Sequence, residues 1–117
     1  MPKIVPARRS AFKPIVVPLA RIGEHVPLDA SNVAQAPASP GVYLLYRGHR
    51  LIYIGASANG GTIRQDLQRH LRGEGGPCTQ RATEFDYEAA SDPLPLYWLY
   101  LDLYREMTGG LLPDCNE

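Results

Sequence analysis

The chain has 117 residues, of which 44% are hydrophobic, and its formal net charge is zero. This length supports one domain of modest size and excludes a second enzyme domain. No stretch approaches the roughly 20 apolar residues that span a bilayer, and the N-terminus lacks the apolar segment of a signal peptide, so we expect a soluble, cytoplasmic protein without membrane contact.

The zero net charge conceals an uneven distribution. The first 81 residues carry eleven Lys and Arg side chains against four acidic ones, whereas the last 36 carry one against eight. Ten of the twelve cations are Arg, whose planar guanidinium suits phosphate. This composition is compatible with a local basic surface for nucleic acid, including the cluster Arg8, Arg9 and Lys13, and equally with charge scattered over a globule.

Residues 1–36 are predicted to form an N-terminal arm, because five prolines in this stretch prevent a regular helix or a central strand. The arm also carries apolar side chains, too many for a pure linker, so we expect part of it to pack on the domain or on a partner. A short helical turn is predicted at 29–35, capped by Asp29 or Ser31.

A β-hairpin is predicted next, because two short runs rich in Val, Ile, Leu and Tyr, at 42–46 and 51–54, flank a turn that contains glycine. Tyr43 and Tyr53 share one face of the sheet if they lie opposite each other. That register leaves the three-residue loop Arg47-Gly48-His49, whereas a two- or four-residue loop would put the phenols on opposite faces.

Residues 62–72 are predicted to form a helix that Thr62 caps and Gly73 ends. Its apolar stripe is narrow and consists of Ile63, Leu67 and Leu71. Arg64 and His70 lie at the two edges of this stripe, from which side chains reach back over a sheet. These positions fit residues that border a site; they also fit an Arg that covers the core with its aliphatic stem and a His that fills space.

Residues 84–89 alternate in character and are predicted to form a third strand, with Phe85 and Tyr87 on one face. A last helix is predicted at 93–107, opened by Asp92-Pro93. We therefore expect a small α/β domain over residues 37–117, with a three-stranded, mainly antiparallel sheet flanked by helices.

The last helix is apolar around most of its circumference, because Leu99 and Leu103 lie away from the face formed by its tyrosines. Such a helix is either deeply buried or part of an interface. We expect the 93–107 helix to be covered by a second copy of the chain, by a protein partner or by the N-terminal arm.

The two cysteines, Cys78 and Cys115, could pair with each other or stay as free thiols in a reducing cytosol. We expect free thiols, because the sequence shows no secretion signal. Together with His49 and His70 they show no spacing typical of a zinc site.

Two tripeptides, Gly41-Val42-Tyr43 and Tyr53-Ile54-Gly55, are followed by an Arg and a His on a helix and by an Asn close to the end of the chain. In these features the sequence resembles the GIY-YIG nuclease domain over residues 37–116. The resemblance implies an endonuclease that hydrolyses phosphodiester bonds in nucleic acid, with DNA preferred over RNA.

The resemblance also implies roles for individual residues. Tyr43 would be the general base and Tyr53 its partner, Arg64 would bind the scissile phosphate, His70 would be an auxiliary hydrogen-bonding group, and Asn116 would tie the C-terminus to the site. Further candidate substrate-binding residues are the arginines around the hairpin and the first long helix: Arg47, Arg69 and Arg72.

Finally, the resemblance implies one divalent metal, Mg²⁺ or Mn²⁺, held by a Glu on the last helix. The matching position here is Tyr97, and a neutral phenol is a poor ligand for Mg²⁺. Glu88 and Asp92 are the candidate substitutes, whereas Asp102 and Glu106 face away. Two hypotheses follow: an endonuclease with a replaced metal ligand, and a catalytically silent member of the fold that binds nucleic acid or protein.

Overall fold

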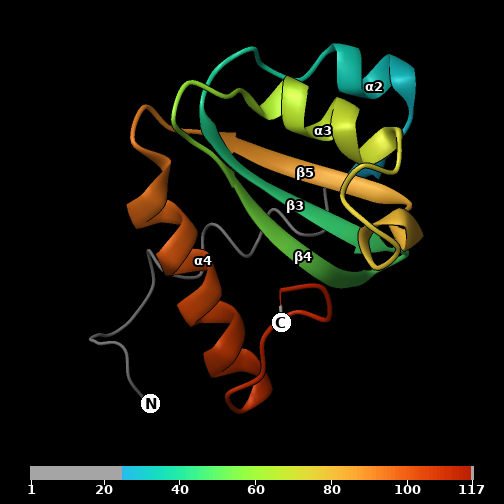
Figure 1. Cartoon of the computed structure of the whole chain (residues 1–117). Coiled ribbons are helices and arrows are strands. Elements are labelled where there is room, and N and C mark those ends of the chain that lie inside the picture. Colours follow the sequence, from blue (N-terminus) through green and yellow to red (C-terminus); the bar gives the residue numbers. More distant parts are fainter. Residues whose placement is uncertain (1–24, 117) are drawn as a thin grey trace.

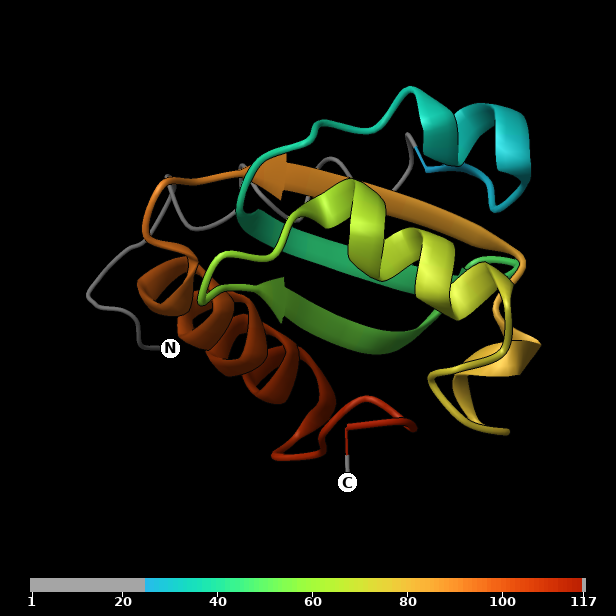
Figure 2. The same cartoon turned by 45° about the horizontal axis from the view of Figure 1, so that its top comes forward.

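The structure, a computed structural model, describes residues 25–116. An antiparallel sheet with strand order β2-β5-β3-β4 lies between helices on both of its faces (Figures 1 and 2). The predicted small α/β domain with an antiparallel sheet is confirmed, but the sheet has four strands instead of three. The additional strand, β2 (Val26–Pro27), pairs with β5 and is too short, and too rich in proline, to give a strand signal in the sequence.

The remaining elements follow the predicted order. They are α2 (Ala30–Ala34), β3 (Gly41–Arg47), β4 (Arg50–Ser57), α3 (Ile63–Leu71), the 3-10 turn η2 (Thr79–Arg81), β5 (Glu84–Ala89) and α4 (Pro93–Thr108). Local signals explain the helix ends: Asp29 Oδ1 accepts a hydrogen bond from Asn32 N, and Gly109 ends α4 with a φ of 75°.

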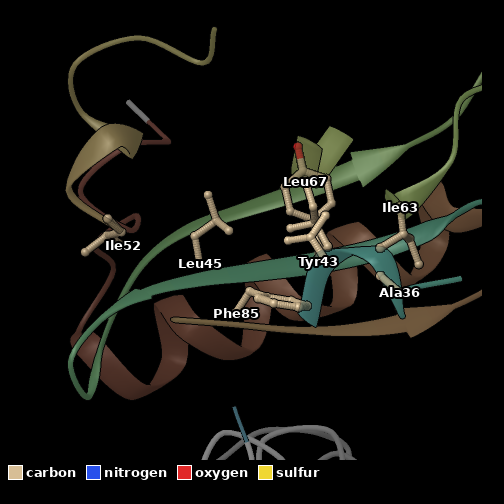
Figure 3. Close-up of a cluster of buried hydrophobic side chains, with 8 residues drawn as sticks. Ala36, Tyr43, Leu45, Ile52, Ile63, Leu67 and Phe85 are labelled. Atoms are coloured by element: carbon tan, nitrogen blue, oxygen red, sulfur yellow. The ribbon is translucent and has the colours of Figure 1, made fainter. Parts of the chain in front are cut away.

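Strand β3 is buried on both faces, and alternate residues serve two separate cores. Tyr43 and Leu45 pack against α2 and α3, as Figure 3 shows, together with Ile63 and Leu67 of α3. On the other face, a second cluster joins the sheet to α4 and contains Val42, Leu44, Tyr46, Leu51, Ile54, Tyr100 and Leu101. The sheet therefore separates a layer of α2 and α3 from the layer of α4, which fixes the face on which each site residue lies.

The predicted register of the hairpin is wrong, although Tyr43 and Tyr53 do share one face of the sheet. Tyr43 pairs with Gly55, and Arg47 pairs with Arg50, so the loop contains only Gly48 and His49. Gly48, with a φ of 62°, takes the left-handed conformation that a two-residue loop requires of its first residue. Such a loop alone would send the two phenols to opposite faces.

A β-bulge in β4 restores the common face. Leu45 pairs with Tyr53 and Tyr46 pairs with Leu51, which leaves Ile52 as an extra residue. Ile52 and Tyr53 consequently both pack on the α3 side of the sheet, where Tyr43 also lies.

The buried face of α3 also differs from the prediction. Leu71 is 38% exposed, whereas Asp66 is 7% exposed and lies with Ile63 and Leu67 among the buried residues of this helix. The face that meets the sheet is thus rotated toward Asp66 and His70. Periodicity alone could not show this, because it ranks Asp66 as a surface residue.

The C-terminal segment completes the edge of β4. Cys115 N donates a hydrogen bond to the carbonyl of Ile52, at the bulge, over 2.8 Å. The side-chain amide of Asn116 then acts as a neighbouring peptide group would: Ile54 N donates to Asn116 Oδ1, and Asn116 Nδ2 donates to Ile54 O, each over 2.9 Å. Asn116 therefore ties this segment to the strand that carries Tyr53.

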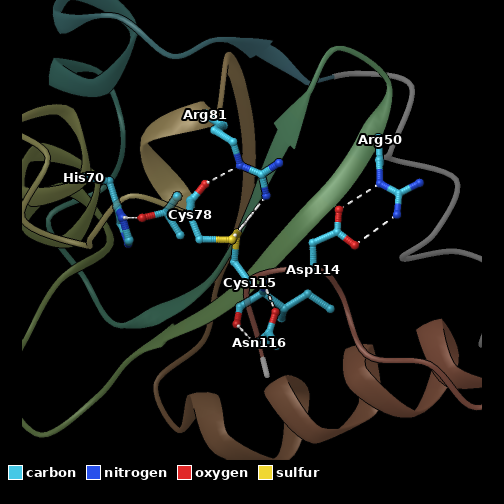
Figure 4. Close-up of a disulfide and its surroundings, with 9 residues drawn as sticks. Arg50, His70, Cys78, Arg81, Asp114, Cys115 and Asn116 are labelled. Atoms are coloured by element: carbon cyan, nitrogen blue, oxygen red, sulfur yellow. Dashed lines mark hydrogen bonds and ion pairs between the residues drawn. A yellow bond between two sulfur atoms is a disulfide. The ribbon is translucent and has the colours of Figure 1, made fainter.

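The expectation of free thiols is wrong, because Cys78 and Cys115 form a disulfide (Figure 4). The C-terminal segment runs along β4 to the loop before η2, which brings the two Cα atoms within 5.7 Å. This distance is typical of bridged cysteines. Sequence separation gave no indication of this proximity.

Residues 25–36, assigned from the sequence to the arm, pack on the domain through β2 and α2. The basic cluster Arg8, Arg9 and Lys13 and the expected packing of the apolar part of the arm lie outside the described residues. On α4, Leu103 is buried and Leu99 is half-buried. In the described part of the chain, no helix has the length and apolar character needed to cross a membrane.

Candidate functional site

Three of the predicted site residues form one aromatic cluster on the α3 side of the sheet. The rings of Tyr43 and Tyr53 are 6.1 Å apart between centroids, and the His70 ring lies 5.5 Å from the first and 5.6 Å from the second. The Tyr43 hydroxyl and His70 Nε2 are hydrogen-bonded over 3.1 Å. The strands β3 and β4 and the helix α3 each contribute one member, and we call this group the Tyr–Tyr–His cluster.

The glycines of the two tripeptides each permit a close packing contact, and that of Gly55 involves a member of this cluster. A Cβ atom at Gly55 would lie 2.3 Å from Cζ of Tyr43, so the phenol of Tyr43 rests directly on the backbone of β4. A Cβ atom at Gly41 would lie 2.6 Å from Cδ1 of Ile63, at the start of α3. Both glycines thus permit a close approach that any side chain would prevent.

Asp66 is the site residue that the sequence analysis missed. Its carboxylate accepts a hydrogen bond from Ser57 Oγ over 2.7 Å and forms an ion pair with Arg69. It also raises the pKa of Tyr43, Tyr53 and His70 alike, which places a negative charge near all three rings. A pointer was present in the sequence, since Asp66 precedes His70 by four residues and so shares its helix face.

The two phenols retain their protons at neutral pH. Burial raises the pKa of Tyr43 well above the ordinary value of 10.0, with smaller contributions in the same direction from Tyr53 and Asp66. Burial also raises the pKa of Tyr53, and the nearby Tyr97 adds to this effect. Both side chains are therefore hydrogen-bond donors rather than phenolates in the resting site.

His70 is neutral at neutral pH, because burial lowers its pKa below 6.5 and outweighs the opposing effect of Asp66. A neutral imidazole carries one N–H, so its tautomer sets the direction of both hydrogen bonds of this ring. With the hydrogen on Nδ1, Tyr43 donates to Nε2 and Nδ1 donates to Thr79 Oγ1 over 3.2 Å; with the hydrogen on Nε2, both directions are reversed. In either tautomer Thr79 orients the ring that is bonded to Tyr43.

The predicted phosphate ligand Arg64 is hydrogen-bonded to the backbone that follows α2. Its Nε donates to the carbonyl of Ala36 over 2.8 Å, on the edge of α3 that faces α2, and within residues 25–116 it makes no hydrogen bond with either phenol. Arg69, at the opposite edge, is the cation next to the cluster through its pairing with Asp66, and it acts to lower the pKa of Tyr43. Arg47 is exposed at the end of β3, and Arg72 is paired with Glu74.

A pocket of about 430 Å³ lies at the C-terminal end of α3. Arg72, Thr79 and Gln80 line it together with His70. His70 is thus the member of the Tyr–Tyr–His cluster that borders this pocket.

The donor set does not fit the divalent metal that the resemblance implies. Tyr97 stands near Tyr53, at the position expected for the carboxylate ligand. Glu88 accepts a hydrogen bond from Tyr100 and pairs with Val42 of the α4 core, so it lies on the far face of the sheet. Asp92 begins α4. Among residues 25–116, no three His, Cys, Asp or Glu side chains gather in a way that could hold a metal ion.

Comparison with known proteins identified no match for this chain among protein-family models, curated proteins or solved structures.

Proposed function

We propose that this chain is an endonuclease of the GIY-YIG type, which binds nucleic acid, with DNA preferred over RNA, and hydrolyses a phosphodiester bond at the Tyr–Tyr–His cluster. The observation that carries the proposal is the hydrogen bond between the Tyr43 hydroxyl and His70 Nε2, beside a second phenol and an Arg–carboxylate pair. The two tripeptides support it further, since Gly55 of the second leaves the space that the Tyr43 ring occupies.

In this proposal His70 is the base and Tyr43 relays the proton. The attacking water gives a proton to the Tyr43 oxygen while Tyr43 gives its own proton to His70 Nε2, so no phenolate forms. This order follows from the two pKa shifts, since Tyr43 is harder to ionise than an ordinary phenol and His70 is neutral. Thr79 stabilises the imidazolium by accepting from Nδ1.

The remaining tasks fall to Tyr53 and Arg69. Tyr53 keeps its proton at neutral pH and is half-buried at the cluster, so it donates that proton to the leaving oxygen. Arg69 supplies positive charge for the developing charge on the phosphate, the role that the sequence analysis assigned to Arg64. No step of this proposal is routed through a metal, since Tyr97 replaces the expected carboxylate and residues 25–116 contain no group of three or more His, Cys, Asp or Glu side chains that could hold a metal ion.

A second candidate function is nucleic-acid binding without cleavage. The placement of Arg64 against Ala36 and the presence of Tyr97 in place of a carboxylate favour it. Both candidates use the same surface, so they differ only in whether the bound phosphodiester is broken.

A partner surface is part of the proposal. Leu94 and Trp98 lie one turn apart on α4 and are 48% and 57% exposed. We assign this pair to contact with a second copy of the chain. Sedimentation of the purified chain over a range of concentrations tests this, and a monomer at all concentrations, unchanged by Trp98→Ala, contradicts it.

The cleavage proposal is tested by incubating the purified full chain with supercoiled plasmid, single-stranded DNA and RNA, each with Mg²⁺, with Mn²⁺ and with a chelator. We expect plasmid nicking, and nicking that persists with the chelator supports the metal-free relay. Binding to all substrates without a cut under any condition supports the second candidate instead. Neither binding nor cutting overturns both.

Variants assign the activity to the site. His70→Gln and Tyr43→Phe should each lower the cleavage rate by about 100-fold, the usual contribution of general base catalysis. Tyr104→Phe is the matched control, because it removes a phenol hydroxyl from α4, on the far side of the sheet. Arg69→Ala should weaken cleavage more than Arg64→Ala; the reverse order would return the phosphate role to Arg64.

A further inference from the structure

The Cys78–Cys115 disulfide is joined to the candidate site at both of its ends. Cys78 is followed by Thr79, whose Oγ1 is hydrogen-bonded to His70 Nδ1. Cys115 is followed by Asn116, whose amide pairs with Ile54 next to Tyr53. Figure 4 shows both connections leading away from the sulfur atoms. The cross-link thus holds together two segments, each of which supports one part of the Tyr–Tyr–His cluster.

An arginine lies against the sulfur atoms. Arg81 Nη2 is 3.2 Å from Cys78 Sγ and 3.9 Å from Cys115 Sγ, and Arg81 Nε donates to the carbonyl of Cys78 over 3.2 Å (Figure 4). A guanidinium so close stabilises a thiolate, and it stabilises that of Cys78 more than that of Cys115. Both cysteines are partly exposed, so a small thiol can reach them.

We propose that the Cys78–Cys115 disulfide is a thiol–disulfide exchange site, which a dithiol reductant opens reversibly, and that its opening releases the supports of the candidate site. If the chain is cytoplasmic, as we expect, the inference agrees with the usual transient or sensing role of disulfides in that compartment.

The reaction begins at Cys115. A thiolate of the reductant attacks Cys115 Sγ and forms a mixed disulfide, and Cys78 leaves as a thiolate beside Arg81, the better leaving group of the two. The second thiol of the reductant, as its thiolate, then attacks the first sulfur of the reductant in the mixed disulfide. This step closes the disulfide of the reductant and releases Cys115. Two electrons pass to the protein, the reductant becomes a disulfide, and its two protons end on the cysteines.

Opening the bond frees the loop before η2 from the C-terminal segment. Thr79 and Asn116 are then held only by their hydrogen bonds, so the orientation of His70 and the pairing at Ile54 both weaken. This inference concerns the conformation of the site and stands independently of the proposed cleavage.

The rate of opening tests the role of Arg81. The oxidised full chain is treated with dithiothreitol, and thiols are counted over time by alkylation and mass spectrometry. We expect Arg81→Gln to slow reduction about three- to tenfold and Arg81→Lys to restore most of the rate, since a poorer leaving group slows exchange. The control Arg105→Gln, on α4, should leave the rate unchanged. Equal rates in wild type and Arg81→Gln overturn the proposal, as does a chain that purifies with two alkylatable thiols.

Amide hydrogen exchange tests the coupling to the site. We expect the Ile54 amide, which donates to Asn116, to exchange about tenfold faster in the reduced chain and in Cys78→Ser, while amides in the middle of β3 keep their rates. Uniformly faster exchange indicates general loss of stability and overturns the coupling, and so does unchanged exchange at Ile54.

Discussion

Tyr43 lies across the hairpin from Gly55, with its phenol ring on the bare backbone of the opposite strand. The ring is 4% exposed and fills the space that a side chain at position 55 would occupy. The position of one residue of the candidate site therefore depends on the absence of a single methyl group in β4.

We predict that Gly55→Ala lowers the free energy of unfolding by about 1–3 kcal/mol, the usual cost of overpacking, and displaces Tyr43 from His70. Urea unfolding measures the first effect, and the His70 imidazole signals in NMR measure the second. Gly61→Ala is the control, because the nearest atom there is a backbone oxygen at 3.3 Å, and it should cost less. Equal losses in both variants would contradict the packing described here.

The charge of Asp66 provides a second test. Asp66 raises the pKa of His70, so we predict that Asp66→Asn lowers this pKa further. An NMR titration of His70 measures the change. The control Glu74→Gln removes an exposed carboxylate that does not act on His70, and it should leave the titration of His70 unaltered. A higher pKa of His70 in Asp66→Asn would mean that the carboxylate lies elsewhere.

The stability of the chain should depend on pH through His70. Its pKa in the folded chain lies below the unfolded value of 6.5, so protonation favours the unfolded state. This contribution is complete above pH 6.5 and is lost as the pH falls through the folded pKa. We predict that the free energy of unfolding falls more between about pH 7.5 and about pH 5 in wild type than in His70→Gln, as urea unfolding at each pH would show. Parallel curves would exclude a depressed pKa of His70.

A fourth prediction tests the resemblance at the metal position. Tyr97 lies near Tyr53, so Tyr97→Glu places a carboxylate at the edge of the cluster. We predict that Mg²⁺ then raises the melting temperature of Tyr97→Glu in a concentration-dependent manner, with little effect on wild type. Leu94→Glu, one turn earlier on the exposed side of α4, is the control. If Mg²⁺ acts equally on all three, Tyr97 does not occupy the position of a metal ligand.

The elements were predictable from the sequence because their signals are local. Thr62 caps α3 by accepting from Gln65 N, and the alternation of Phe85 and Tyr87 marks β5. The shared face of Tyr43 and Tyr53 was also inferred correctly, although from a wrong register.

What failed depends on contacts between distant residues. The burial of Asp66 requires Ser57, nine positions earlier on β4, and the disulfide requires the C-terminal segment to run along the bulge. No local pattern records either contact. The buried face of α3 is centred nearer to Asp66 than its leucines suggest, and Arg64 donates to the carbonyl of Ala36.

The bulge at Ile52 shows what the spacing between the two tyrosines specifies. Three residues between them lack a partner in the ladder, namely Gly48, His49 and Ile52, and a three-residue loop would also leave three. An odd number keeps both phenols on one side of the sheet wherever the unpaired residues fall. The ten-residue interval therefore specifies that the number of unpaired residues is odd, but it does not specify which residues pair. A hairpin of this kind can thus exchange a residue of the loop for a bulge in a strand during evolution and still present both hydroxyls on the same face.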